Sequence, residues 1–264
     1  MGVINVTPDS FSDGGRFASN EAAVAHALRM IEEGAGLIDV GGESTRPGAQ
    51  GVSAEEEIGR VVPVIEALAA RTKVPISVDT SKPAVMTAAV RAGASMINDV
   101  RALREPGAVE AAAKTAAAIC LMHMQGEPRT MQADPRYDDV VAEVRDFLRE
   151  RAHACLASGI AKDRLVLDPG IGFGKRLEHN LALLAGMRAL TDLGWPVLIG
   201  VSRKSMFGTL LRRAVDQRVA GGVAMATAAV LAGASIVRTH DVAATVDAVK
   251  VAVALRAAGY PRGV

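Results

Sequence analysis

Aromatic residues are scarce in this chain, since Trp, Tyr and Phe together make up 3% of its 264 residues. Half of the residues are nevertheless hydrophobic, so alanine and aliphatic side chains must fill the core. Cysteine is also rare, and Cys120 and Cys155 lie far apart in the sequence. So few cysteines exclude a disulfide-rich scaffold and predict free thiols in a reducing compartment.

The chain also has little net charge and no long hydrophobic run. Thirty Lys and Arg against twenty-nine Asp and Glu leave a formal charge of +1, without the basic excess of a typical nucleic-acid-binding domain. No apolar stretch approaches the ~20 residues of a membrane span. The first residues lack the basic and hydrophobic segments of a signal peptide. We therefore expect a cytoplasmic protein that binds neither nucleic acid nor membrane.

A short apolar run, a polar residue, a loop and a helical stretch follow one another eight times. The runs are rich in Val, Ile and Leu with little polar alternation, which is typical of parallel strands covered on both faces. We predict strands over residues 2–6, 37–40, 76–78, 96–97, 118–122, 165–167, 197–200 and 236–237. We predict helices near residues 21–33, 54–71, 83–92, 107–114, 138–158, 177–190, 216–232 and 242–257.

The same glycine-containing junction precedes three of these strands, at Gly34, Gly93 and Gly233. At each junction we expect the glycine to take a left-handed conformation that ends a helix. Eight βα units in about 250 residues predict an α/β fold with one domain over residues 1–264, a (β/α)8 TIM barrel with its active site at the carboxyl-terminal rim of the strands. An open doubly wound sheet is the alternative, because the period alone does not distinguish the two folds.

Residues that can bind or ionise lie at the end of every predicted strand or shortly after it. They are Asn5, Asp39 with Glu43, Asp79, Asn98 with Asp99, His123, Asp168, Ser202 to Lys204, and Arg238 with His240. Carboxylates and amides directed into one mouth cost free energy unless they have partners, which favours a ligand site over a purely structural role. We assign Asp39, Asp99 and Asp241 to bracing loops or capping helices. We interpret His123 as an internal histidine and Arg203 as a surface cation.

Cationic residues gather after the last two predicted strands, whereas acids and amides end the third, fourth and sixth. Arg238 and His240 are two residues apart on a short strand, so their side chains should share a direction. Barrels often hold phosphate groups at this place. The mouth therefore predicts a ligand with a donor-rich head and an anionic tail. Two polar, glycine-bearing loops, residues 5–15 and 41–48, are long enough to fold over it.

Eight longer motifs lie at these strand ends. They are Asn5-Val6-Thr7-Pro8-Asp9-Ser10-Phe11-Ser12-Asp13-Gly14-Gly15, Gly42-Glu43-Ser44-Thr45-Arg46-Pro47-Gly48, Ser77-Val78-Asp79-Thr80, Asn98-Asp99-Val100, Met122-His123-Met124-Gln125-Gly126, Asp168-Pro169-Gly170-Ile171-Gly172-Phe173-Gly174-Lys175, Ser202-Arg203-Lys204-Ser205 and Arg238-Thr239-His240-Asp241-Val242. In residues and order they resemble the motifs of the dihydropteroate synthases, pterin-binding enzymes of folate biosynthesis.

This resemblance implies a transferase that condenses 7,8-dihydropterin-6-ylmethyl diphosphate with 4-aminobenzoate, giving 7,8-dihydropteroate and diphosphate. It also implies a (β/α)8 barrel, Mg²⁺ as cofactor, a homodimer, and sensitivity to sulfonamides. Motif by motif, it implies pterin contacts from Asp79, Asn98, Asp168 and Lys204. It implies diphosphate contacts from Asn5, Arg46, Arg238 and His240, with Asn5 also binding the metal. The aminobenzoate pocket would contain Thr45, Pro47, Phe173 and Ser202.

The expected chemistry assigns catalysis to Asp79, Lys204, Arg238, His240 and Asp9. Departure of diphosphate leaves positive charge on the pterin, which a nearby carboxylate stabilises, while cations stabilise the leaving group. Because an aromatic amine is a weak nucleophile, we expect an SN1-like substitution. Two alternatives remain. One is a catalytically silent pterin-binding paralogue. The other is a methyltetrahydrofolate-dependent methyltransferase, which would share the carboxylate–amide half of the mouth but not the diphosphate half.

Overall fold

The computed structural model describes residues 1–7, 15–44, 51–127 and 130–260. Within these ranges short parallel strands alternate with helices along the chain, as expected from the repeated apolar runs. The strands are β1 (Gly2–Asn5), β2 (Ile38–Gly41), β3 (Ile76–Asp79), β4 (Met96–Asp99), β5 (Ala118–Met122), β6 (Leu165–Asp168), β7 (Leu198–Gly200) and β8 (Ile236–Arg238). Each lies within about two residues of its predicted range.

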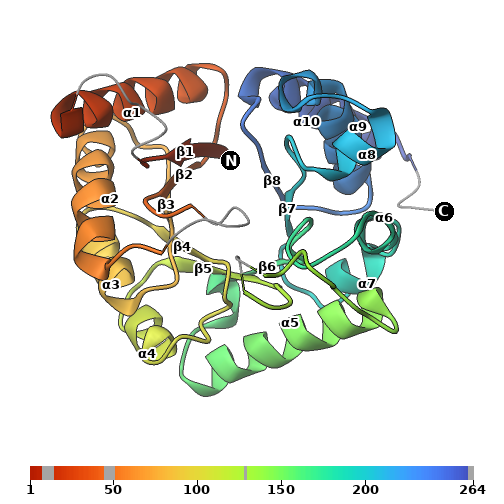
Figure 1. The fold of residues 1–264 in the computed structure, drawn as a ribbon, viewed down its shortest axis with the longest axis horizontal. Coiled ribbons are helices and arrows are strands. Elements are labelled where there is room, and N and C mark those ends of the chain that lie inside the picture. Colours follow the sequence, from red (N-terminus) through yellow and green to blue (C-terminus); the bar gives the residue numbers. More distant parts are fainter. Residues whose placement is uncertain (8–14, 45–50, 128–129, 261–264) are drawn as a thin grey trace.

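The helices lie outside the strands and cover them (Figure 1). They are α1 (Gly15–Glu32), α2 (Ala54–Ala69), α3 (Pro83–Arg91), α4 (Ala108–Ala113), α5 (Val140–Ala157), α6 (Leu177–Ala185), α7 (Arg188–Thr191), α8 (Met206–Leu211), α9 (Val219–Leu231) and α10 (Val242–Ala257). Three details differ from the prediction. Helix α1 begins at Gly15 and not near residue 21, the helix expected over 177–190 divides at Gly186, and α8 was not expected. None of the helices in the described ranges combines the length and apolar character needed to cross a lipid bilayer.

The strands run round a ring in sequence order. Strands β1 to β6 form one parallel sheet and β7 pairs with β8. Isolated parallel bridges join the two sheets at both edges, Leu167 to Val197 on one side and Gly2 to Thr239 on the other. Figure 1 shows the resulting circle of strands with helices around it. The predicted (β/α)8 barrel is confirmed, and the open doubly wound alternative is wrong because the strand order never reverses.

The core has two parts because alternate strand residues point to opposite sides. Met96, Cys120, Val166 and Leu198 pack together inside the barrel. A much larger cluster lies between the strands and the helices. Both cysteines are buried and unpaired, as expected. The scarcity of aromatic residues is therefore accommodated by aliphatic, alanine and sulfur-containing side chains in both parts.

The three glycine junctions have the conformation expected from the sequence. Gly34, Gly93 and Gly233 have φ angles of +98°, +118° and +109°, a region that residues with a Cβ rarely adopt. Each glycine ends one helix and lets the chain turn directly into β2, β4 or β8. The junctions therefore keep the loops at the amino ends of these strands short.

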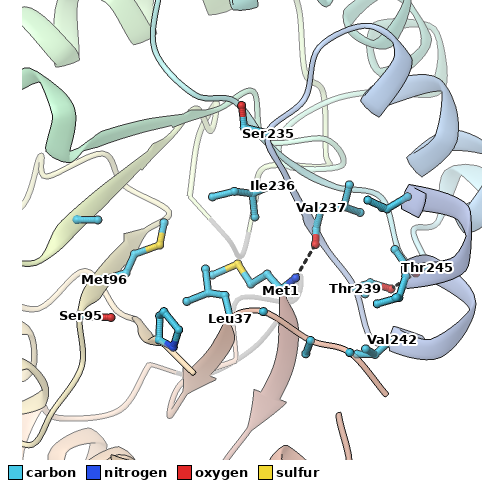
Figure 2. A pocket seen from close by; sticks show the side chains of 17 residues that line it. Met1, Leu37, Ser95, Met96, Ser235, Ile236, Val237, Thr239, Val242 and Thr245 are labelled. Carbon is cyan, nitrogen blue, oxygen red and sulfur yellow. Dashed lines mark hydrogen bonds between the residues drawn. The ribbon is translucent and has the colours of Figure 1, made fainter. Parts of the chain in front are cut away.

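An apolar cavity of about 560 Å³ lies at the amino ends of the strands. Its lining includes Met1, Leu37, Met96 and Ile236, which Figure 2 shows converging from different parts of the ring. Leu37 directly precedes β2 and Ile236 begins β8, so the cavity opens at one end of the barrel. The polar residues predicted to form a site follow the strands at the other end. The two regions are therefore separate.

Candidate active site

The register of the first four strands brings acids and amides to the same level of the barrel. Asn5 pairs with Gly41, Gly41 with Asp79, and Asp79 with Asn98. Residues in register on parallel strands present their side chains to the same face. Gly41 has no side chain, which leaves space between Asn5 and Asp79. Asp79 and Asn98 are both buried at the carboxyl ends of their strands.

Arg238, at the end of β8, joins this group by two ion pairs. Its Nε donates to Asp39 Oδ2 at 2.7 Å, and its Nη2 donates to Asp79 Oδ2 at 2.9 Å. Asn98 Nδ2 donates to the same Asp39 oxygen at 3.0 Å. The cationic and carboxylate–amide halves of the predicted mouth therefore meet at atomic contact. Asp39 contacts both halves within the mouth, whereas the sequence assigned it to bracing a loop or capping a helix.

The electrostatics of Asp79 reflect burial among charged neighbours. The pKa of Asp79 is raised to about 7 as the net result of opposing effects. Burial raises the pKa most, the charge of Arg238 lowers it, and the negative charge of Asp39 raises it. The two carboxylates raise the pKa of Arg238 in turn, against the effect of its own burial. Arg238 therefore stays charged while the protonation of Asp79 is sensitive to its surroundings.

Asp168, Lys204 and Phe173 form a second group beside the first. The Lys204 ammonium lies 4.2 Å from the centre of the Phe173 ring, a cation–π contact. Burial lowers the pKa of Lys204 to about 8, although the charge of Asp168 favours the protonated form. Asp168 is buried at the end of β6, and its Oδ1 accepts a hydrogen bond from the Gly170 amide at 2.7 Å. A carboxylate, an ammonium and an aromatic face therefore lie together.

His240 and Ser202 form a third group, next to Arg238. Ser202 Oγ lies 3.2 Å from His240 Nδ1 and accepts a hydrogen bond from the His240 amide at 3.1 Å. Burial, followed by the charge of Arg238, lowers the pKa of His240 to about 4. The ring is therefore neutral near pH 7, and its inclusion among the cations of the mouth was wrong. Arg203 is exposed, as expected, and it pairs with Asp241, which was not predicted.

Comparison with known proteins identifies the family. Residues 1–240 match the family described as "Pterin binding enzyme". The chain belongs to the pterin-binding enzyme family. The protein named dihydropteroate synthase in Escherichia coli (strain K12) is 56% identical over 251 residues, covering 95% of this chain and 89% of that protein. The resemblance seen in the motifs is thereby confirmed.

Solved structures agree with this family assignment. A Yersinia pestis dihydropteroate synthase in a sulfonamide drug complex superposes with a TM-score of 0.93 and 55% identity, covering 97% of this chain and 94% of that one. The Xanthomonas albilineans dihydropteroate synthase with 4-aminobenzoic acid gives a TM-score of 0.92 and 57% identity, covering 97% and 92%. The barrel of this pterin-binding enzyme is therefore the fold of these relatives.

Among the described residues, Asn5 is the one predicted to bind the Mg²⁺ ion. No group of three or more His, Cys, Asp or Glu side chains in the described ranges could hold a metal ion. Mg²⁺ commonly keeps several waters and binds to one or two protein groups plus substrate phosphates. A single amide oxygen at the end of β1 therefore fits a magnesium ion that arrives with an anionic substrate.

Some expected site residues of the pterin-binding enzyme fall outside the described residues. They are Asp9 in the first loop, and Thr45, Arg46 and Pro47 in the second. The loops begin at residues that are described, since Val6 and Glu43 follow β1 and β2. Glu43 pairs with Lys82, which also pairs with the buried Glu57 at 2.5 Å. The base of the second loop is therefore fixed to α2 and the start of α3.

Sequence reasoning missed two arrangements in this pterin-binding enzyme. The contact of Asp39 with Arg238 and Asn98 was not foreseen, although the shared strand face of Asp39 and Gly41 could have indicated it. The internal position of His123 is confirmed, but its partner Lys175 was not foreseen. Asp99 braces a turn, as expected, because its carboxylate accepts from the Arg101 and Leu103 amides.

Proposed function

We propose that this enzyme condenses 7,8-dihydropterin-6-ylmethyl diphosphate with 4-aminobenzoate, forming 7,8-dihydropteroate and releasing diphosphate. The observation that carries the proposal is Arg238 bridging Asp39 and Asp79, because it joins an anion-binding group to a heterocycle-binding group in one mouth. The relatives named dihydropteroate synthase support the same reaction.

The proposed pterin site uses the two carboxylates and their neighbours. Adjacent N–H groups on the aminopyrimidinone edge match the carboxylate of Asp168, which can accept two hydrogen bonds. Asn98 offers both a donor and an acceptor, and Lys204 donates to ring acceptors. Asp79, when ionised, lies where it would stabilise positive charge on the ring.

The proposed aminobenzoate site lies on the side of Phe173 and Ser202. Lys204 links it to the pterin site, since its ammonium sits over the Phe173 ring. Thr45 and Pro47 would complete the pocket. Arg238, with Asn5, Arg46 and neutral His240 as hydrogen-bonding groups, would hold the diphosphate. Mg²⁺ would add positive charge on the diphosphate beside Asn5.

The proposed course is SN1-like, with departure of diphosphate ahead of attack by the amine. Arg238 stabilises charge that grows on the leaving group, and an interaction of this kind typically contributes ~10²–10³ in rate. A secondary deuterium isotope effect at the exocyclic carbon tests this course. We expect a value clearly above unity, and a value near unity would exclude it.

The decisive assay for the function is diphosphate release that requires both substrates. A silent paralogue would bind the pterin, seen as a raised melting temperature, without releasing diphosphate. A methyltetrahydrofolate-dependent methyltransferase would release none and would bind methyltetrahydrofolate. We expect EDTA to abolish release and added Mg²⁺ to restore it. The homodimer and the cytoplasmic location also stay predictions, and sedimentation of the purified protein tests the first.

A further inference from the structure

The loop after β6, residues 168–175, packs against the segment after β5 at backbone contact. Gly170 has a φ of +66°, and a Cβ placed there would lie 1.9 Å from the carbonyl oxygen of His123. Gly174 has a φ of +60°, and a Cβ there would lie 2.3 Å from the Gln125 carbonyl oxygen. Contacts this close leave no room for side chains at Gly170 and Gly174. Because side-chain packing cannot hold the loop at these two positions, its conformation depends on hydrogen bonds to its backbone.

Lys175 supplies the central hydrogen bonds of this loop although it lies outside the proposed chemistry. Its side chain is buried, and the whole residue is 3% exposed. Its Nζ donates to the carbonyl oxygens of Gly170 and Phe173, both at 3.0 Å, and lies 2.9 Å from His123 Nδ1. None of its hydrogen-bond partners among the described residues is a carboxylate. Burial lowers the pKa of Lys175 to about 7, although the charge of Asp168 favours the protonated form. Its ammonium form therefore costs free energy at this position, so a purely stabilising origin is a poor explanation.

His123 can accept a hydrogen bond from Lys175 because the His123 ring is neutral. Burial, followed by the charge of Lys175, lowers the pKa of His123 to about 3. Its ring packs edge-on against Phe147 at 4.9 Å between centres. His123 Nδ1 is therefore a fixed acceptor for the Lys175 side chain, whose Nζ also donates to the His123 carbonyl oxygen at 3.4 Å.

Lys175 donates hydrogen bonds to Gly170 and Phe173, and both residues contact the candidate active site. The Gly170 amide donates to Asp168 Oδ1 at 2.7 Å, and Gly170's carbonyl accepts from Lys175. The Phe173 carbonyl also accepts from Lys175, while the Phe173 ring supports Lys204. Lys175 thus contacts the backbone at Gly170 and at Phe173, the residues that orient the Asp168 carboxylate and carry the aromatic ring beside Lys204.

We propose that Lys175, seated on His123, is a positioning residue that sets the orientation of Asp168 and Phe173 toward Lys204. Its effect on substrates rests on the proposed synthase function, whereas its effect on the loop does not. Gln132 and Tyr137 also donate to this loop, at the carbonyls of Gly172 and Gly174. Neither of those bonds reaches the Gly170 or Phe173 carbonyl. The Gly170 carbonyl accepts from Lys175 and from the Phe173 amide, and the Phe173 carbonyl accepts from Lys175.

The kinetic test compares Lys175→Met with Arg164→Met. Arg164 is a matched control because its guanidinium also donates to backbone carbonyls, at Ala117 and Ala112, beside the amino end of the same strand. Small misplacements of site groups cost on the order of 10- to 100-fold. We expect Lys175→Met to raise KM for 4-aminobenzoate by this factor, with a smaller change in kcat. We expect Arg164→Met to lower thermal stability but leave both KM values within twofold.

The structural test measures hydrogen exchange of the amides of Gly170 to Lys175. We expect faster exchange there in Lys175→Met than in the wild-type protein or in Arg164→Met. A folded Lys175→Met variant with unchanged exchange and unchanged KM overturns the proposal. If Lys175→Met does not fold, Lys175→Gln takes its place, and failure of both to fold assigns Lys175 to stability alone. Faster loop exchange in an enzyme that makes no dihydropteroate would refute the proposed function but keep the positioning role.

Discussion

Replacing Asp39 by Asn tests whether this buried carboxylate sets the charge of the site. Asp39 Oδ2 accepts from Arg238 at 2.7 Å and from Asn98 at 3.0 Å. A hydrogen bond to a charged group contributes ~1.5–3 kcal/mol and a neutral one ~0.5–1.5 kcal/mol, so two weakened bonds cost roughly 2–3 kcal/mol. The substitution also removes a buried negative charge, and the desolvation energy saved in this way offsets part of the cost. We expect a net loss of about 1–2 kcal/mol, or a fall in Tm of roughly 2–8 °C.

The same substitution should change the pH dependence of the reaction. The charge of Asp39 is one of the causes that raise the pKa of Asp79, so removing it lowers that pKa. If Asp79 must be ionised for turnover, the acid limb of the profile of kcat/KM for the dihydropterin diphosphate should move to lower pH. Asp192→Asn, which removes an exposed carboxylate paired with Arg188 at 3.7 Å, should leave the limb in place. If the acid limb of the kcat/KM profile is unchanged or moves to higher pH in Asp39→Asn, this reasoning is refuted.

Three further perturbations give separate outcomes. Arg238→Lys should lower kcat/KM for the dihydropterin diphosphate by on the order of 10², measured as diphosphate release, because an ammonium cannot replace the two-armed guanidinium contact; a change under threefold would contradict this. Gly170→Ala should lower the free energy of unfolding in urea by roughly 2–4 kcal/mol. Gly36→Ala should have little effect, because a Cβ there meets nothing within 4 Å. Below pH 6.5 the unfolded chain gains a proton on His123 that the folded chain, with its pKa of about 3, does not. Stability should therefore fall by about 2 kcal/mol from this residue at pH 5. The fall between pH 7.5 and pH 5 should shrink in His123→Asn but not in His153→Asn, and an equal fall in both variants would exclude the assignment.

The positions of the strands were predictable because each is encoded by a local apolar run. The runs before Asp79 and Asp168 identified strand ends correctly, and parallel strands place all such ends at one rim. The short helix α8 was missed because its six residues lie in a loop between β7 and α9 and show no full apolar period. The division of the helix at Gly186 was missed because apolar spacing continues through α7.

The residue types of the site were predictable, but their charges were not. His240 was counted as a cation because a histidine next to Arg238 in sequence gives no measure of its burial. In the structure, burial lowers its pKa to about 4. Lys175 was the last residue of the motif after the sixth predicted strand and was given no role, because its acceptors come from a turn and from a different strand end. Burial and distant partners thus decide what ionisable residues do.

The sequence by itself determined the order of strands and helices and the family, because these follow from local apolar runs, glycine junctions and motifs. The tertiary structure decided between a closed barrel and an open sheet, because ring closure depends on pairing between distant strands. Only the tertiary structure decided which charges meet. Asp39 and Arg238 are 199 residues apart in the chain and form an ion pair because ring closure places β8 next to β1. Electrostatic energy depends on distance and burial, and neither is contained in a local stretch of sequence.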